Sequence, residues 1–240
     1  MAAVVTFDAD GTLCDFQRLM ATALAAALAE LQQLVPNERT AALTVEDLRL
    51  TRDLVAADLR GQRLTMEEVR LAAFTRTLEQ MGRPDSALAA HLLDVYLARR
   101  FGEVALYPDV VPTLDTLGSR YRLGLVSNGN SYPERSGLGN RFAFTVFAQD
   151  HGVQKPDRQF YEIVLATAGV AAGEVIHVGD SLPNDVGGAQ ALGIRTVWLN
   201  RGNLPLDALL RPDAVITTLT DLPAVLQALD HPWSDVSSPS

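Results

Sequence analysis

The sequence is poor in two residue types, with a single cysteine, Cys14, and a single lysine, Lys155, in 240 residues. One cysteine excludes an internal disulfide and is typical of a reducing compartment, so we expect a cytoplasmic protein. No run of about 18 apolar residues is present, which argues against a membrane-spanning helix. No basic leader precedes an apolar segment at the start, so we expect no secretory signal.

Positive charge is also scarce. Asp and Glu number 29 against 20 Lys and Arg, which gives a net charge of −9. A chain with this balance has no global field to attract a polyanion, so we expect neither a nucleic acid polymer nor an anionic membrane as partner. With 48% hydrophobic residues, the chain can bury a sizeable core in one large domain or two small ones.

Lys155 is the one lysine among the 20 Lys and Arg residues. Arginine and lysine differ in shape and hydration and are not interchangeable in a tight site. Composition alone leaves two interpretations equal: a site that needs a compact ammonium at Lys155, or chance.

The stretch from Val4 to Leu13 gives the first indication of chemistry. Its first half is apolar and β-branched and is bounded by a turn signal, which predicts a buried strand. Asp8 and Asp10 follow at the carboxyl end, and Gly11 marks a turn that lets the second carboxylate swing over the first. Two crowded carboxylates are costly unless a cation or a proton offsets their charge.

The next part of the chain, roughly residues 15 to 101, has a helical pattern. The expected helices are residues 16–34, a segment from the cap Thr44 to about 61, one from the cap Thr65 to about 82, and one from Ser86 to about 102. Their apolar residues recur at spacings of three and four, which predicts a small helical bundle.

From Leu106 onward, predicted strands alternate with helices. The expected strands are residues 122–126, 144–148, 175–178, 196–199 and 214–216, and the expected helices are 109–117, 157–168, 184–192 (capped near Asn184) and 221–229. This alternation predicts a parallel sheet covered on both faces. We therefore expect residues 1–14 and 106–240 to form a three-layer, Rossmann-like α/β core with an inserted all-helical cap domain at 15–105, and residues 230–240 to be a disordered tail.

Polar residues follow several of the predicted strands. They are Asp8, Asp10, Ser127, Asn128 and Asp180, to which a loop adds Lys155 and the segment after Asp180 adds Asp185. Open parallel sheets bind ligands beyond the carboxyl ends of their strands, near the switch in strand order. The inserted helices leave the core at this end, so we expect them to cover the site as a lid.

These residues resemble, in order, the four motifs of the haloacid dehalogenase-like (HAD) hydrolases, a superfamily made mostly of phosphatases. The matching segments are Asp8-Ala9-Asp10-Gly11-Thr12, Ser127-Asn128-Gly129, Lys155-Pro156-Asp157 and residues 179–185. The inserted helices resemble the C1-type cap of the branch with phosphoglycolate phosphatase, 5′-nucleotidase-like phosphatases and the dehalogenases. Ala9 departs from the bulkier apolar residue that is usual between the two aspartates.

The resemblance implies Mg²⁺-dependent hydrolysis of a small-molecule phosphate monoester. Asp8 would form an aspartyl-phosphate, and Asp10 would act as general acid and then general base. The supporting residues implied are the metal ligands Asp8, Asp180 and the main-chain carbonyl of Asp10, the phosphate-holding residues Ser127, Asn128, Lys155 and Thr12, and Asp185, which would orient Lys155 or a water of the metal. Lys155 is also counted among the catalytic residues.

The same residues have structural interpretations. Two pairs could simply form turns, namely Asp8 with Asp10 and Ser127 with Asn128. A helix could be capped by Asp180 and Asp185. Simple packing could explain Cys14 and His177.

Other activities remain as alternatives. A sugar phosphomutase shares the core residues and differs mainly in its cap, and a nucleotide is another candidate substrate. A 2-haloacid dehalogenase lacks the second aspartate because a halide needs no proton, so Asp10 favours phosphate chemistry. A phosphonatase needs a cap lysine, and residues 15–105 contain none. A non-catalytic HAD-fold binding protein would be expected to have lost an aspartate or the lysine, and all are present.

Overall fold

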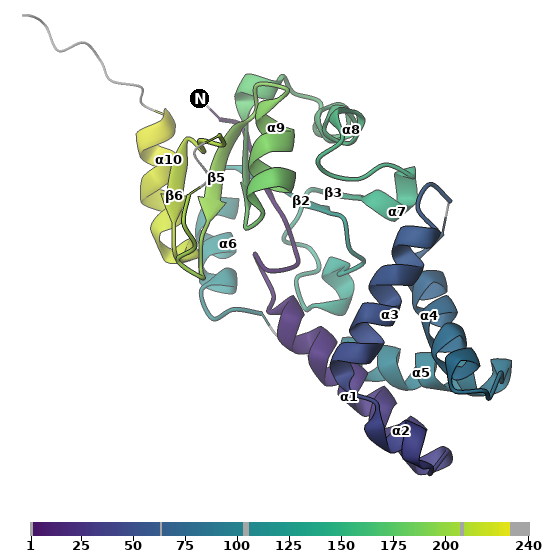
Figure 1. Cartoon of the computed structure of the whole chain (residues 1–240). Coiled ribbons are helices and arrows are strands. Elements are labelled where there is room, and N and C mark those ends of the chain that lie inside the picture. Colours follow the sequence, from purple (N-terminus) through teal and green to yellow (C-terminus); the bar gives the residue numbers. More distant parts are fainter. Residues whose placement is uncertain (1, 63, 103–105, 207–208, 231–240) are drawn as a thin grey trace, which may run out of the picture. The chain divides into compact units, whose positions relative to one another are not determined.

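The computed structural model describes residues 2–62, 64–102, 106–206 and 209–230. The chain divides into two units, a core unit of Met1–Cys14 with Leu106–Ser240 and a helical unit of Asp15–Ala105 (Figure 1). Apart from Asp230, the predicted disordered tail lies outside the described residues.

A six-stranded parallel sheet with the order β3-β2-β1-β4-β5-β6 forms the centre of the core unit. The strands are β1 (Val4–Phe7), β2 (Arg122–Ser127), β3 (Phe144–Phe147), β4 (Val175–Gly179), β5 (Arg195–Leu199) and β6 (Ala214–Ile216). Phe7 of β1 is in register with Leu125 of β2 on one side and with Val178 of β4 on the other. The strand order reverses at β1, so the carboxyl ends of β1, β2 and β4 lie together at the switch point.

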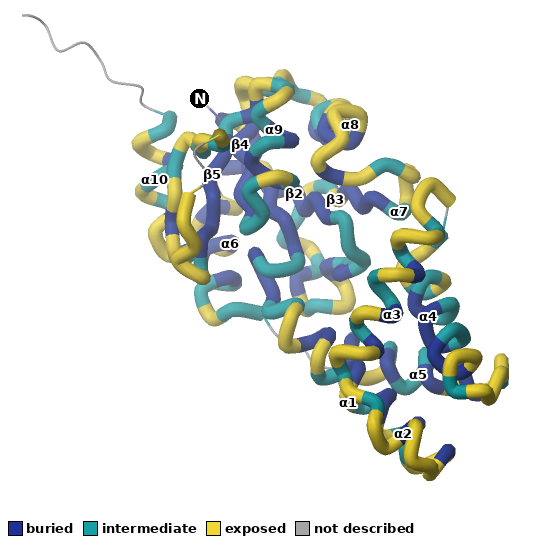
Figure 2. Tube along the Cα trace, in the orientation of Figure 1, coloured by how far each residue is buried: buried dark blue, intermediate teal, exposed yellow. Residues whose placement is uncertain are grey.

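Helices cover both faces of this sheet. They are α6 (Val110–Gly118) and α10 (Leu222–Asp230) on one face, and α8 (Arg158–Ala168) and α9 (Gly188–Gln190) on the other. Side chains alternate along a strand, so Phe7 packs in the cluster of α6 and α10 whereas Val4 packs in that of α8 and α9. Figure 2 shows β2, β4 and β5 almost entirely buried between these layers. The predicted three-layer, Rossmann-like architecture is confirmed.

Five helices are described in the helical unit: α1 (Phe16–Leu34), α2 (Glu38–Ala42), α3 (Val45–Asp58), α4 (Met66–Gln80) and α5 (Ser86–Gly102). Thr44 and Thr65 cap α3 and α4 as expected, each accepting a hydrogen bond from the main chain three residues on. The short α2 was not predicted, because five residues are too few to show a helical period. The sequence feature that could have marked its start is the capping box at Asn37. Leu24, Leu78 and Leu92 lie in the apolar centre of this unit.

The prediction for residues 184–192 was wrong in detail. A π-helical turn, η3 (Leu182–Gly187), comes first, and its cap is Ser181 rather than Asn184; the Ser181 hydroxyl accepts from the Asn184 N–H at 3.4 Å. The remaining short elements are α7 (Ala148–His151) and the 3₁₀ turns η1 (Pro133–Arg135), η2 (Ala172–Glu174) and η4 (Leu219–Asp221). In the described ranges, no helix combines the length and apolar character required to cross a membrane.

Candidate active site

Asp8 directly follows β1, at the centre of the carboxyl edge of the sheet. Its main-chain N–H donates to the Val178 carbonyl at 2.9 Å, which holds it level with the end of β4. The residue is only 6% exposed. Burial raises the pKa of Asp8 well above its ordinary value, and the Asp185 and Asp180 carboxylates raise it further. The positive charge of Lys155 lowers the pKa of Asp8 but does not cancel these effects. Asp8 therefore needs nearby positive charge to remain ionised.

Lys155 supplies such a charge from a loop between α7 and α8. Its ammonium donates to Asp8 Oδ1 and Asp185 Oδ1, both at 2.6 Å, and to the Val126 carbonyl at 3.1 Å. These three acceptors match the three N–H bonds of an ammonium. Burial alone would lower the pKa of Lys155, but the Asp185 and Asp8 carboxylates outweigh it and the pKa is raised. Lys155 is therefore a permanently charged, fully hydrogen-bonded cation beside Asp8.

Asp185, on the π-helical turn, anchors this lysine. Its Oδ1 also lies 3.1 Å from His177 Nε2, and its Oδ2 accepts from the Ser181 N–H at 2.9 Å. Burial alone would raise the pKa of Asp185, but Lys155 and His177 more than offset it and the pKa is lowered. Asp185 is thus held ionised, with both oxygens occupied.

His177 was interpreted from the sequence as a packing residue. Its Nδ1 lies 2.9 Å from the hydroxyl of Thr6, its partner on β1, and burial lowers its pKa. A neutral ring that donates from Nε2 to Asp185 would accept from Thr6 at Nδ1. The signal in the sequence that could have revealed this role is a single polar residue, Thr6 or His177, inside each of two otherwise apolar strands.

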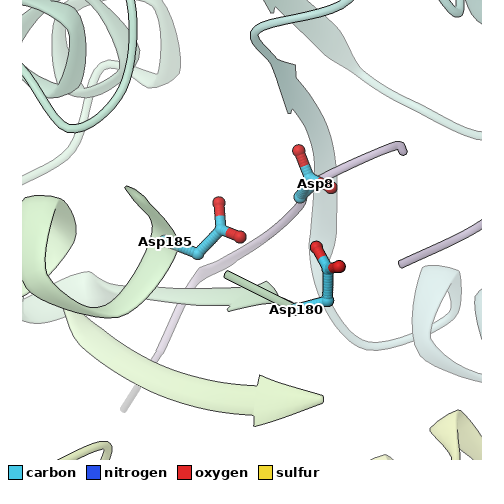
Figure 3. A group of neighbouring side chains, drawn as sticks. All are labelled: Asp8, Asp180 and Asp185. Atoms are coloured by element: carbon cyan, nitrogen blue, oxygen red, sulfur yellow. The ribbon is translucent and has the colours of Figure 1, made fainter. Parts of the chain in front are cut away.

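Three carboxylates converge at this edge, from Asp8 after β1, Asp180 after β4, and Asp185 on η3 (Figure 3). One oxygen from each lies within 4.8 Å of the others. Burial, followed by the charge of Asp185, raises the pKa of Asp180 to about 6. Gly11, with φ +94°, leaves room for this group, since a Cβ at that position would overlap the Asp180 carboxylate.

This donor set fits a hard divalent cation. Mg²⁺ prefers oxygen ligands, and the crowded carboxylates carry more negative charge than Lys155 offsets. Asp185 already accepts hydrogen bonds from protein donors at both oxygens, which leaves Asp8 and Asp180 as the predicted metal ligands. The main-chain carbonyl of Asp10 stays a prediction as a further ligand.

Asp10 lies two residues beyond Asp8 and is partly buried. Its Oδ1 accepts from the Ser131 hydroxyl at 2.5 Å, and the Cys14 thiol lies 3.6 Å from the same oxygen. Neither contact was predicted from the sequence.

The loop after β2 holds the other predicted phosphate-binding residues. Ser127 is buried and its hydroxyl accepts from the Gly129 N–H at 3.0 Å. The side-chain amide of Asn128 hydrogen-bonds to the main chain of Lys155, so this side chain positions the lysine. Contact of Ser127 and Asn128 with phosphate stays a prediction.

Thr12 is completely buried. Within the described part of the chain its hydroxyl has no hydrogen-bond partner, and its carbonyl accepts from Arg201 at 3.2 Å. Phosphate binding by Thr12 likewise stays a prediction.

The chain is similar to known proteins over most of its length. The family model of haloacid dehalogenase-like hydrolases matches residues 2–193. The 5-amino-6-(5-phospho-D-ribitylamino)uracil phosphatase YigB of Escherichia coli (strain K12) is 29% identical over 232 residues, covering 92% of this chain and 95% of that protein.

Two solved structures are also similar. The 2-haloacid dehalogenase from Pseudomonas syringae pv. Tomato DC3000 is 34% identical with a TM-score of 0.80, covering 95% of this chain and 100% of that one. The putative HAD-hydrolase YfnB from Bacillus subtilis, solved bound to magnesium, is 25% identical with a TM-score of 0.72, covering 94% of this chain and 98% of that one.

Proposed function

This chain belongs to the haloacid dehalogenase-like hydrolases, and on that premise we propose that it hydrolyses small-molecule phosphate monoesters with the help of Mg²⁺. The observation that carries the proposal is Asp10, a second carboxyl group two residues beyond Asp8. Cleavage of a carbon–halogen bond releases a halide, which needs no proton, whereas ester cleavage releases an alkoxide, which does. A group positioned to donate a proton favours the ester.

In the first step an oxygen of Asp8 bonds to phosphorus as the ester P–O bond breaks. Asp10 gives its proton to the departing alkoxide oxygen and becomes a carboxylate. The products are an alcohol and an aspartyl-phosphate on Asp8. Lys155, whose ammonium lies 2.6 Å from Asp8 Oδ1, favours the ionised form of the nucleophile before this step.

In the second step a water attacks phosphorus and passes a proton to the Asp10 carboxylate. The bond between phosphorus and Asp8 breaks, which releases inorganic phosphate and restores both aspartates. We assign the phosphoryl oxygens to Ser127, Asn128 and Lys155, because charge builds on these oxygens during transfer and N–H and O–H donors stabilise it. Lys155 would act mainly through its positive charge, because its three N–H bonds go to Asp8, Asp185 and the Val126 carbonyl.

Asp8 and Asp180 would hold Mg²⁺, with the Asp10 carbonyl as a further ligand. When bound, the cation would supply charge neutralisation between the nucleophile and the phosphate. The raised pKa values of Asp8 and Asp180 support this assignment, because both carboxylates lack enough positive charge from the protein alone.

The test is phosphate release from a panel of phosphate monoesters, in Mg²⁺ and in chelator, by the wild type and by Asp8→Asn. The E. coli relative is named for a phosphoribityl compound, so the panel includes polyol phosphates beside sugar phosphates, nucleotides and phosphoglycolate. We expect Mg²⁺-dependent release that Asp8→Asn lacks, at unchanged fold. Near-normal turnover by Asp8→Asn would remove Asp8 from the mechanism.

The similarity to a 2-haloacid dehalogenase makes that activity the second candidate. Halide release from 2-haloacids, measured in parallel without phosphate release, would favour the dehalogenase. Conversion to an isomeric phosphate would favour a mutase, and ligand binding without turnover would favour a binding protein. We infer a cytoplasmic location from the single cysteine.

A further inference from the structure

Asp10 and Ser131 form a close contact across a long stretch of sequence. The Ser131 hydroxyl donates to Asp10 Oδ1 at 2.5 Å, although the two residues are 121 positions apart. Ser131 is only 7% exposed, so water competes little for this bond. The Cys14 thiol lies 3.6 Å from Oδ1 and at the same distance from the Ala9 carbonyl, so Ser131 is the closer donor to this oxygen.

The other oxygen of Asp10 is confined by the same loop. A Cβ atom added to Gly129 would overlap Asp10 Oδ2, which means that the carboxyl group lies directly against the glycine backbone. Gly129 is itself fixed, since its N–H donates to the Ser127 hydroxyl at 3.0 Å. The loop after β2 therefore contacts Asp10 at both oxygens.

We infer that Ser131 is a positioning residue for the proton transfer by Asp10. By donating to Oδ1, Ser131 fixes the plane of the carboxyl group and makes Oδ1 the accepting oxygen, which leaves the transferable proton on Oδ2. In the first step this proton moves from Oδ2 to the alkoxide oxygen as the ester bond breaks. In the second step the same oxygen takes a proton from the attacking water. This inference rests on the proposed function.

A positioning role differs from a purely structural one in its dependence on the leaving group. Loss of a structural hydrogen bond would slow all substrates alike. Misplacement of a general acid slows the first step only for those substrates whose leaving group needs a proton in the transition state. p-Nitrophenolate leaves readily without a proton, whereas the alkoxide of glycerol 3-phosphate does not.

The experiment compares these two substrates in the wild type, Ser131→Ala and Ser131→Thr, with Ser136→Ala as the matched control. The Ser136 hydroxyl donates to the Pro133 carbonyl at 3.2 Å in the same segment and is not placed in the site. For Ser131→Ala we expect kcat/KM, which reports the first step, to fall about 10-fold or more with glycerol 3-phosphate and less than about threefold with p-nitrophenyl phosphate. The second step is common to both substrates, so kcat does not separate them. Ser131→Thr should restore much of the loss in kcat/KM, and Ser136→Ala should match the wild type.

A series of aryl phosphates gives a second readout. The kcat/KM values of Ser131→Ala should depend more steeply on leaving-group pKa than those of the wild type. Equal losses of kcat/KM on both substrates, or none, would overturn the inference while leaving the proposed function in place.

Gly129→Ala keeps Ser131 but crowds Asp10 Oδ2, so this variant should show the same selective loss. If Ser131→Ala does not fold, Gly129→Ala provides the test in its place. Failure of the wild type to hydrolyse any ester would instead overturn the proposed function, and the inference with it.

Discussion

The side-chain amide of Asn128 forms hydrogen bonds with both main-chain polar groups of Lys155. Asn128 Oδ1 accepts from the Lys155 N–H at 2.8 Å, and Asn128 Nδ2 donates to the Lys155 carbonyl at 3.0 Å. The two residues are 27 positions apart, so this pair of bonds ties the loop after β2 to the loop that carries the lysine. The link holds the main chain of the residue whose ammonium lies between Asp8 and Asp185.

Asn128→Ala removes both bonds without touching the charged groups. We expect the free energy of unfolding to fall by about 1 to 3 kcal/mol, because main-chain groups of Lys155 lose their partners. Displacement of the ammonium should lower kcat by about 10-fold or more. Denaturant unfolding and phosphate release check these values, and an unchanged kcat in a folded variant would contradict the positioning role.

Lys155→Arg should impair catalysis although the charge is kept. Lys155 is 2% exposed and its three acceptors suit a compact ammonium, whereas a planar guanidinium is larger and directs its donors differently. We expect kcat to fall about 100-fold and overpacking to cost about 1 to 3 kcal/mol of stability. The control is Arg158→Lys at an exposed ion pair with Glu162, which should leave both quantities unchanged. Unimpaired turnover by Lys155→Arg would make the retention of lysine accidental.

Gly11→Ala should disrupt metal binding without altering a ligand. Gly11 and Gly61 both have positive φ, +94° and +87°, but an added Cβ overlaps the Asp180 carboxylate only at Gly11 and has no neighbour within 4 Å at Gly61. Both alanine variants should lose roughly 1 kcal/mol to backbone strain.

The measurement is the rise in Tm that Mg²⁺ produces and chelator removes. A hundredfold excess over Kd corresponds to about 2.7 kcal/mol of stabilisation. We expect the rise in the wild type and in Gly61→Ala and its loss in Gly11→Ala. Equal Mg²⁺ responses of the two variants would argue against Asp180 as a metal ligand.

Asp109→Asn should make stability less dependent on pH. Burial alone would raise the pKa of Asp109, but hydrogen bonds from Arg201, Thr218 and the Leu219 main chain outweigh it, and the pKa is lowered. The Asp109 side chain is 12% exposed and meets both terminal nitrogens of Arg201 at 2.9 Å, so solvent screens the pair only weakly.

A carboxyl group whose pKa is lowered by folding contributes stability above its ordinary pKa of 3.8 and loses it as the pH falls through the folded value. We therefore expect Asp109→Asn to be less stable than the wild type by about 1 to 2 kcal/mol at pH 7, and the difference to shrink as the pH falls below the ordinary pKa of 3.8 and through the folded value. Denaturant unfolding across this pH range checks the sign. A difference that grows as the pH falls would contradict it.

Local patterns predicted most of the elements. Thr44 and Thr65 marked the starts of α3 and α4, because capping is decided within four residues of sequence. Apolar β-branched runs marked the strands for the same reason. The π-helical turn at Leu182–Gly187 was not predicted, since its residues also suit an ordinary helix and its wider turn has no sequence period of its own to detect.

The sequence by itself determined the three-layer α/β class and the order in which polar residues follow the strands, because both depend on short-range pattern and on the rule that ligands bind at the carboxyl ends of parallel strands. Only the tertiary structure decided which of these residues meet. Lys155 lies between Asp8 and Asp185, and Ser131 reaches Asp10 across 121 positions. Such contacts depend on how separate strands pair and how their loops pack, and no local propensity encodes them.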